Sequence, residues 1–475
     1  MKQPILCLLF LLSLYSGVAQ DKWDLKRCVE YALANNISVK QADLQTRFSQ
    51  LQLKQDRLSQ LPFATAQGSS GYSFGLSENP TTGTLESRNF FNTQVGLSTN
   101  VTLFNWFSRK HQVQASALNL QAEEAQARKV QDDVALNVAV AYLQALLAKQ
   151  QAGIAAIQVQ QTALQLDITR KRVNAGALPE LNAVQLEAQL AADSAALVSA
   201  QGNVQQLLLQ LKALLNLDAA APFDIAAPPV EQIPLESLAD LQPEAVYQLA
   251  LVNLPQQKVN ELRIQSAEKT VAAARGNMLP VIAAFGGLNS RFVNIESIQG
   301  TAFVPRKTTG AVVNVNGVDY DVLAPGINIT SVGVTPFFRQ FRNNFGQNIG
   351  VGVSVPLLNG GALRTNWQRS KLNVQQLELQ KEGASQTLKQ DIYRAYTDAV
   401  TAMQRFNAAR KAVDAAEKAF GFAQKRYDVN LLPTFELINT QNNLLRVRQE
   451  LLTAQFDYVF RMKLLEFYKG QGLKL

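Results

Sequence analysis

The fold is decided by residues 106–173, WFSRKHQVQASALNLQAEEAQARKVQDDVALNVAVAYLQALLAKQQAGIAAIQVQQTALQLDITRKRV, a run of 68 residues without a proline. Apolar or small side chains recur along it at alternating spacings of three and four residues, the pattern of a coiled-coil seam. The seam residues are Val113, Ala117, Leu120, Ala127, Val134, Val138, Ala141, Ala145, Ala148, Ala152, Ala155 and Val159, with Glu124 and Gln131 as polar members before Thr162. At about 1.5 Å of rise per residue, one helix over this range spans roughly 100 Å, far more than a compact domain requires.

A second proline-free run of the same length, residues 361–428, belongs to an internal repeat. Two offsets relate the copies, 218 residues before the predicted hairpin loop and 254 residues after it. The matching residues include Leu44 with Leu262, Leu61 with Leu279, Pro62 with Pro280, Arg172 with Arg426, and Pro179 with Pro433. Because the offsets differ by 36 residues, the second hairpin holds an insertion of that size within about 291–345. We expect the insertion to be a loop at a solvent-facing hairpin tip, on the extracellular side.

Residues 1–19 have the composition of a secretory signal peptide. Lys2 precedes an apolar run from Ile5 to Leu14, and the small residues Gly17 and Ala19 predict cleavage after Ala19. Beyond this segment no window holds 18 apolar residues, so the sequence predicts no transmembrane helix. An exported chain without one lies in the periplasm, is secreted, or forms a barrel in the outer membrane.

Composition excludes several classes of function. The net charge is +8, but Lys and Arg are scattered along the chain rather than grouped, which argues against nucleic-acid binding. His111 is the only histidine, and Cys28 is the only cysteine after the predicted signal. We therefore expect no enzyme site, no metal site, no cofactor and no intrachain disulfide.

Two segments alternate like strands with one apolar face. Ile349, Val351 and Val353 alternate with Asn348, Gly350 and Gly352, and a similar pattern runs from Val95 to Leu103. A soluble sandwich gives the same alternation, but aromatic residues border the earlier strand at about the spacing of a bilayer, roughly 30 Å. These predicted girdle residues are Phe90, Phe91, Phe104, Trp106 and Phe107. Together with the export signal, they favour strands in a membrane.

The predicted organisation follows the repeat. Residues 20–218 form the first copy and 243–475 the second, joined by a linker at 219–242 that lies outside the main bundle. Within the copies we predict hairpins at 61–104 and 279–358, long helices at 106–173 and 361–428, and return helices at 180–216 and 433–468. Each chain then offers four strands, which cannot close a barrel alone, and an open edge cannot exist in lipid. Several chains must therefore share one barrel; three chains would supply twelve strands.

Taken together, these features resemble the TolC-like family of outer-membrane efflux and secretion channels. The resemblance is carried by the order of the repeated elements and by four motifs: WDLKRCVEYALANN at 23–36, VPLLNGGALRTN at 355–366, RVNAGALPEL at 172–181 and RYDVNLLPTF at 426–435. It implies an internally duplicated α+β membrane protein, a homotrimer whose 12-stranded β-barrel, with four strands per chain, continues into a long α-helical coiled-coil tunnel across the periplasm. The location implied is the outer membrane of a Gram-negative cell.

The resemblance also implies the partners and the role. Such channels are passive ducts of tripartite efflux pumps or type I secretion systems. They dock on a periplasmic adaptor, or membrane fusion protein, and on an inner-membrane pump of the RND, ABC or MFS type, and they contact outer-membrane lipid. They carry drugs, small molecules, metals or proteins to the exterior.

Two sets of site residues follow from the resemblance. The helix turns that receive the adaptor correspond to Arg172, Gly176, Ala177 and Leu178, and to Arg426, Asn430, Leu431 and Leu432. Asn430 stands where the family usually has glycine, and asparagine tolerates the left-handed conformation that such a turn needs. The periplasmic gate corresponds to Glu436, Asn439 and Tyr427. Only one of the two gate acids is kept, and Leu432 matches the latch arginine, so the latch differs from the family pattern.

A second hypothesis is a soluble or fibrous periplasmic coiled coil, such as an adhesin stalk. It accounts for the long helices but leaves the two half-apolar hairpins and their aromatic borders unexplained.

Overall fold

The computed structural model describes residues 22–78, 83–87, 89–226 and 235–470. The predicted signal peptide lies outside these ranges. The chain divides into a helical unit (1–53, 115–268 and 372–475) and a unit that contains the strands (54–114 and 269–371). Each unit therefore combines segments of both sequence repeats, whereas the predicted boundaries followed the repeats themselves.

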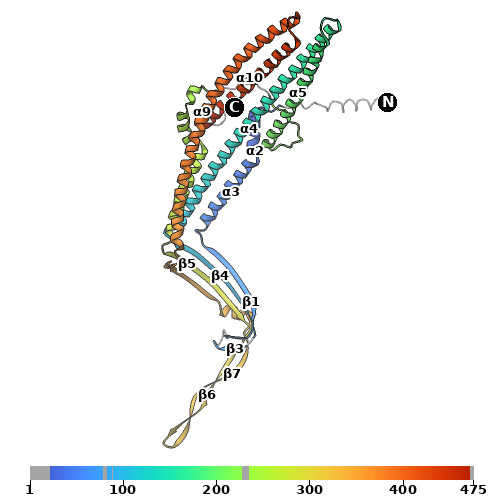
Figure 1. Cartoon of the computed structure of the whole chain (residues 1–475). Helices are drawn as coiled ribbons and strands as arrows, with labels where there is room; N and C mark the ends of the chain where they lie inside the picture. Colours follow the sequence, from blue (N-terminus) through green and yellow to red (C-terminus); the bar gives the residue numbers. More distant parts are fainter. Residues whose placement is uncertain (1–21, 79–82, 88, 227–234, 471–475) are drawn as a thin grey trace, which may run out of the picture. The chain divides into compact units, whose positions relative to one another are not determined.

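Long helices dominate the chain (Figure 1). The helices are α2 (Leu25–Asn35), α3 (Ile37–Leu58), α4 (Ser108–Asn174), α5 (Glu180–Leu215), α6 (Pro243–Asn253), α7 (Pro255–Gly276), α8 (Phe337–Asn343), α9 (Ala362–Asp428) and α10 (Thr434–Tyr468). The short 3-10 helix η2 covers Leu238–Leu241. At 67 residues each, α4 and α9 are the two long helices expected from the proline-free runs.

The ends of the long and return helices differ from the predicted ends by at most two residues, and the differences have local reasons. Trp106 and Phe107 have φ values of 53° and 60°, which are left-handed, so α4 begins at Ser108. Asn216 is also left-handed at φ 57° and ends α5 at Leu215. Pro433 precedes α10 as its N-cap, in an extended conformation.

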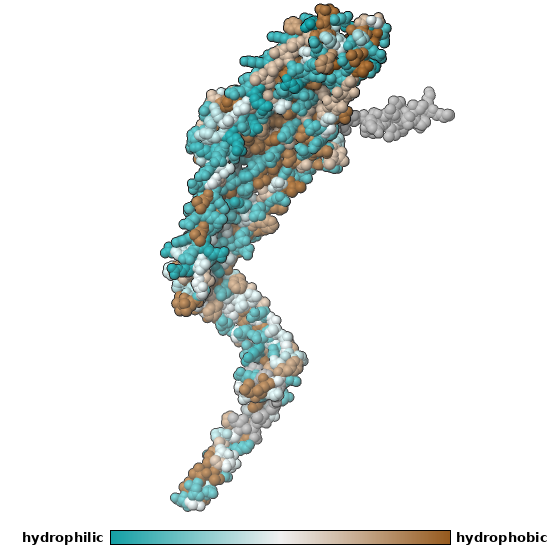
Figure 2. All heavy atoms as spheres, in the orientation of Figure 1, coloured by the Kyte–Doolittle hydropathy of each residue, from teal (hydrophilic) through white to brown (hydrophobic). Residues whose placement is uncertain are grey.

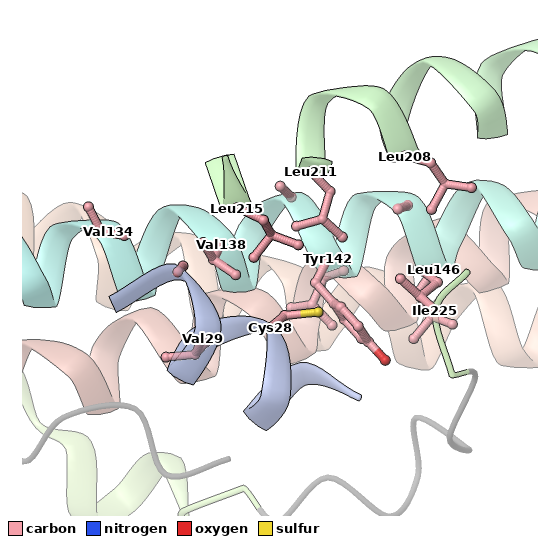
Figure 3. Close-up of a cluster of buried hydrophobic side chains, with 14 of the residues drawn as sticks. Cys28, Val29, Val134, Val138, Tyr142, Leu146, Leu208, Leu211, Leu215 and Ile225 are labelled. Atoms are coloured by element: carbon pink, nitrogen blue, oxygen red, sulfur yellow. The ribbon is translucent and has the colours of Figure 1, made fainter. Parts of the chain in front are cut away.

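The largest apolar core of the helical unit joins α2, α4 and α5 (Figure 3). Cys28 is fully buried there, and burial raises the pKa of its thiol to about 12. The Tyr142 side chain lies beside it, and the Tyr142 hydroxyl donates to the carbonyl oxygen of Ala226 at 2.7 Å. A buried thiol of this kind packs as a small apolar side chain rather than as a reactive group.

The segment predicted as an outlying linker instead contributes to the cores of the helical unit. Ile225 is fully buried in the cluster around Cys28 and pairs with Trp23 as a parallel β-bridge. Lys149 of α4 holds the neighbouring Asp224 at 2.6 Å. Leu241 is fully buried in a second cluster with residues of α6, α9 and α10. The Ala- and Pro-rich composition suggested a linker, but its isolated large apolar residues anchor both ends.

The unit that contains the strands is built on one four-stranded antiparallel sheet in the order β1, β4, β5, β8 (Figure 1). Its strands are β1 (Phe63–Ser73), β4 (Phe90–Phe104), β5 (Val281–Val293) and β8 (Gly346–Ser354). The central pair joins the two repeats, with Leu97 opposite Leu288. Within the described residues, β1 and β8 each have one edge without a neighbouring strand in this sheet.

The strand registers place apolar side chains on one face of this sheet. Leu97, Leu288, Ile349 and Val351 share that face, and the four side chains are exposed. Small and polar residues such as Gly96, Asn289 and Asn348 lie on the other face. Phe285 also lies on that second face, and its ring covers Gly350 so closely that a Cβ there would lie 2.6 Å from the ring. The predicted alternation of an apolar and a small polar face is therefore present.

The insertion in the second repeat forms a two-stranded ribbon rather than an irregular loop. Strands β6 (Glu296–Val315) and β7 (Val318–Val334) pair with each other, and α8 follows them. Asn316 and Gly317, both with positive φ, make the tight turn at the tip. A smaller ribbon, β2 (Leu76–Glu78) with β3 (Leu85–Ser87), occupies the equivalent place in the first hairpin.

None of the helices in the described ranges combines the length and the apolar composition that crossing a membrane requires.

Candidate functional site at the helix turns

The two turns that end α4 and α9 have the same backbone geometry. In the first, the N–H of Ala177 donates to the carbonyl of Arg172 at 2.9 Å. In the second, the N–H of Leu431 donates to the carbonyl of Arg426 at 2.8 Å. The residue before each donor is left-handed, Gly176 at φ 77° and Asn430 at φ 60°. Asn430 thus adopts the conformation predicted for it, and the repeat preserves the turn without a second glycine.

The turn residues divide into exposed and buried side chains. Gly176, Ala177, Arg426, Asn430 and Leu431 are exposed, while Arg172 and Leu178 are half-buried. Leu432 was predicted to belong to the docking turn, but its side chain is only 9% exposed and packs against Ala423, Tyr427 and Leu437. Its side chain supports the turn from inside and is not available as a docking surface.

Two arginines differ in how their guanidinium groups are paired. Arg426 donates from Nη2 to the carbonyl of Leu431 at 3.3 Å, which braces the second turn. The Nη1 atom of Arg172 is buried without a hydrogen-bond partner in the described part of the chain. An unpaired buried donor of this kind is destabilising until an acceptor reaches it.

Tyr427 joins three helices at the base of the turns. Its hydroxyl lies 3.0 Å from Oγ1 of Thr169 on α4 and accepts from Oγ1 of Thr434 on α10 at 3.4 Å. All three side chains are nearly or fully buried. Tyr427 thereby ties the long helix of the second repeat to the long helix of the first and to its own return helix.

Glu436 and Asn439 lie three residues apart on α10, and both are exposed. Glu436 is in the first turn of the helix, where a carboxylate interacts favourably with the helix dipole. Such a spacing puts both side chains on one face of the helix.

A buried polar network that the sequence did not predict joins α4, α5 and α10. Asp193 of α5 accepts hydrogen bonds from Thr162 Oγ1 at 2.6 Å and Gln189 Nε2 at 2.7 Å. Gln441 of α10 donates to Thr162 at 3.3 Å and so joins the second repeat to this network. The internal repeat could have indicated this network, because at the offset of 254 the charged Asp193 corresponds to the apolar Val447.

The predicted girdle residues lie at the two ends of β4. Phe90 and Phe91 begin the strand, and Phe104 ends it. The Phe104 ring contacts the rings of Trp106 and Phe107, with centroids 5.3 and 5.7 Å apart. Trp106 Nε1 donates to the carbonyl of Pro280 at 2.9 Å. Phe104, Trp106 and Phe107 therefore form one aromatic cluster at the helix end of the strand.

No group of three or more His, Cys, Asp or Glu side chains that could hold a metal ion occurs in the described residues. His111, half-buried, lies 3.3 Å from the side-chain oxygen of Gln114.

Comparison with known proteins gives one consistent family. A family model described as outer membrane efflux protein matches residues 28–217 and 246–462. The chain is 22% identical over 367 residues to the outer membrane efflux protein BepC of Brucella suis biovar 1 (strain 1330), covering 77% of this chain and 69% of BepC. It is 23% identical over 350 residues to the outer membrane protein TolC of Escherichia coli (strain K12), covering 72% of this chain and 63% of TolC.

A solved structure has the same fold. CusC, described in connection with transmembrane channel formation, matches with a TM-score of 0.73 and 17% identity, over 95% of this chain and 93% of that chain. The soluble coiled-coil hypothesis finds no support in any of these matches. The family is a transport family rather than an enzyme family. The chain belongs to the outer membrane efflux protein family and is a TolC-type channel of the outer membrane.

Proposed function

We propose that three copies of this chain close one barrel and one helical tunnel, and that the assembly is the passive outer-membrane exit of a tripartite pump. The observation that carries the proposal is the four-stranded sheet, whose outer strands β1 and β8 have open edges and whose one face is apolar. Unpaired backbone groups are prohibitive in lipid, so each open β1 edge must pair with a β8 edge of another copy. Three copies give twelve strands, an even number within the range of bacterial barrels.

The exposed turns support docking of a periplasmic adaptor. They present Gly176, Ala177, Asn430 and Leu431 at the same geometry in both repeats, so three copies would offer six similar sites. The unpaired Nη1 of Arg172 would gain an acceptor from a docked chain. The inner-membrane pump is of the RND, ABC or MFS type, and it selects the cargo among drugs, small molecules, metals or proteins.

Glu436, Asn439 and Tyr427 support a gate at the same end of the tunnel. In three copies, the exposed Glu436 would form a single ring of carboxylates. The buried contact of Tyr427 with Thr169 would hold the helices together in the closed state, and it must break or shift when they separate.

The experiment is purification from outer membranes in mild detergent, followed by light scattering and planar-bilayer recording. We expect a particle of three chains. In a planar bilayer it should give discrete conductance steps that persist as the applied voltage is changed. A monomeric, water-soluble protein without conductance would refute the proposal.

Deletion of the gene should also raise the drug or metal sensitivity of the cell, and complementation should restore the resistance of the wild type.

A further inference from the structure

We propose that the β6–β7 ribbons of the three copies pack against one another beyond the barrel, through one apolar face near their tips. This inference rests on the proposed function, because the partner that covers this face is the same face of the other two copies in one channel. Each ribbon would then join the three copies a second time, outside the membrane.

The outer end of the ribbon has one apolar face. In an antiparallel pair, residues directly opposite each other and residues two apart along a strand share a face. Val313 lies opposite Tyr320, and Val315 lies opposite Val318, so these four side chains form one face without a charge. They are 50% to 58% exposed. Hydrophobic residues gather near the free end of the ribbon in Figure 2.

The opposite face of the same segment is polar and acidic. Asn314 lies opposite Asp319, and Val312 lies opposite Asp321. Asn314 Nδ2 donates to Asp319 Oδ1 at 2.7 Å. If this face were turned inward in three copies, the carboxylates of Asp319 and Asp321 would be brought together, and like charges repel. The charge pattern therefore favours contact between copies through the face of Val313 and Tyr320.

The ribbon needs a partner because it is thin. In the described part of the chain, β6 and β7 form a sheet of two strands and pair only with each other. A two-stranded ribbon by itself is marginally stable in water, and an exposed apolar patch adds a tendency to associate. Covering the apolar face would stabilise the ribbon.

The geometry of the proposed barrel favours a second copy as that partner. Twelve strands spaced about 4.8 Å apart and tilted about 40° give a barrel radius of roughly 12 Å, so the three ribbons start roughly 20 Å apart. Strand β7 has 17 residues and extends about 56 Å at about 3.3 Å per residue. The ribbons are thus long enough to meet. Tethered in this way, their tips have an effective concentration on the order of mM for one another.

Two irregularities allow the ribbon to bend below its tip. The register shifts between Val304 and Lys307, and again between Thr308 and Val312. Bulges of this kind bend a strand and increase its twist, so the segment beyond them can turn its apolar face toward the barrel axis. Because the ribbons meet only near their tips, solute can leave between their lower parts, and conductance need not depend on the contact.

Two neighbouring valines on opposite faces provide a matched cross-linking test. In a Cys28→Ala background, oxidation of purified Val313→Cys trimers should give disulfide-linked dimers in at least half of the chains. Cysteines bridge only when their Cα atoms come within about 7 Å. The control is Val312→Cys, since Val312 is 58% exposed against 51% for Val313 but lies on the acidic face. It should give at least fivefold less dimer. A tenfold dilution should leave both yields unchanged, because the contact lies within one particle.

A charge at the same two positions provides a second measurement. Val313→Asp places three like charges at the contact and should separate the ribbons. A separated ribbon opens more often, so trypsin added to intact cells should cleave after the exposed Lys307 at least fivefold faster than in the wild type. Val312→Asp adds its charge to the face that already carries Asp319 and Asp321 and should change the rate less than twofold.

Light scattering of each variant separates this inference from the proposed function. A three-chain particle without cross-linking at position 313, or with equal effects at positions 312 and 313, overturns the ribbon contact and leaves the proposed function intact. Cross-linking of Val313→Cys to a different protein on intact cells also overturns it. A monomer from the Cys28→Ala parent overturns both. Cross-linking and protection from trypsin that depend on Val313 but not on Val312 support the contact.

Discussion

Glu436 is the one carboxylate among the three proposed gate residues, and it is exposed. Replacing Glu436 with Ala removes the whole ring of charge in three copies, because Asn439 on the same face is neutral. We expect higher single-channel conductance, or loss of block by divalent cations, in planar bilayers. Asn439→Ala is the control and should leave divalent block unchanged. If Glu436→Ala changes neither quantity, the gate assignment is wrong.

Asp193 is a buried charged residue at a position where the second repeat has the apolar Val447. Its carboxylate receives hydrogen bonds from Thr162 and Gln189, while Val447 at the matching position packs in an apolar cluster. Asp193→Ala removes the acceptor of two buried donors, Thr162 Oγ1 and Gln158 Nε2, so we expect a loss of about 1–3 kcal/mol in the free energy of unfolding. Thermal unfolding in detergent measures it. Asp193→Asn retains one acceptor oxygen and should lose less; an equal loss would mean that packing, not hydrogen bonding, matters.

At the level of whole elements, the ribbon of β6 and β7 is separable from the sheet. Its partners are each other, whereas β5 and β8 pair directly from Val281 with Ser354 to Asn289 with Gly346. Replacing residues 296–334 with a short Gly-containing turn should therefore leave the yield of assembled trimer and its conductance within about twofold of the wild type. Heat-resistant oligomers on gels and bilayer recording check this. Failure to assemble would show that the ribbon helps to close the barrel.

The same elements show what sequence patterns can and cannot predict. The alternation around Val351 predicted a strand, and the proline-free run of α4 predicted a helix. Both predictions are correct, because side chains of one kind recur in each element at the spacing that places them on one face. The ribbon was predicted as a loop, since its Gly, Pro and Asn residues are those of loops while its pairing is entirely local. Leu432 was placed on the surface because turn position alone does not reveal burial.

For the whole molecule, the apolar face of the sheet can be tested against the membrane. Val351 lies on that face of β8, and Asn348 lies on the opposite, polar face. An arginine facing lipid costs about 2–4 kcal/mol near the bilayer midplane, and three copies multiply the penalty in one closed barrel. Val351→Arg should therefore reduce assembled trimer in the outer membrane at least tenfold, while Asn348→Arg faces the lumen and should assemble and alter ion selectivity instead. Quantitative blots of membrane fractions and reversal potentials measure the two effects. Normal assembly of Val351→Arg would mean that this face does not meet lipid, because a solvated sheet surface tolerates arginine.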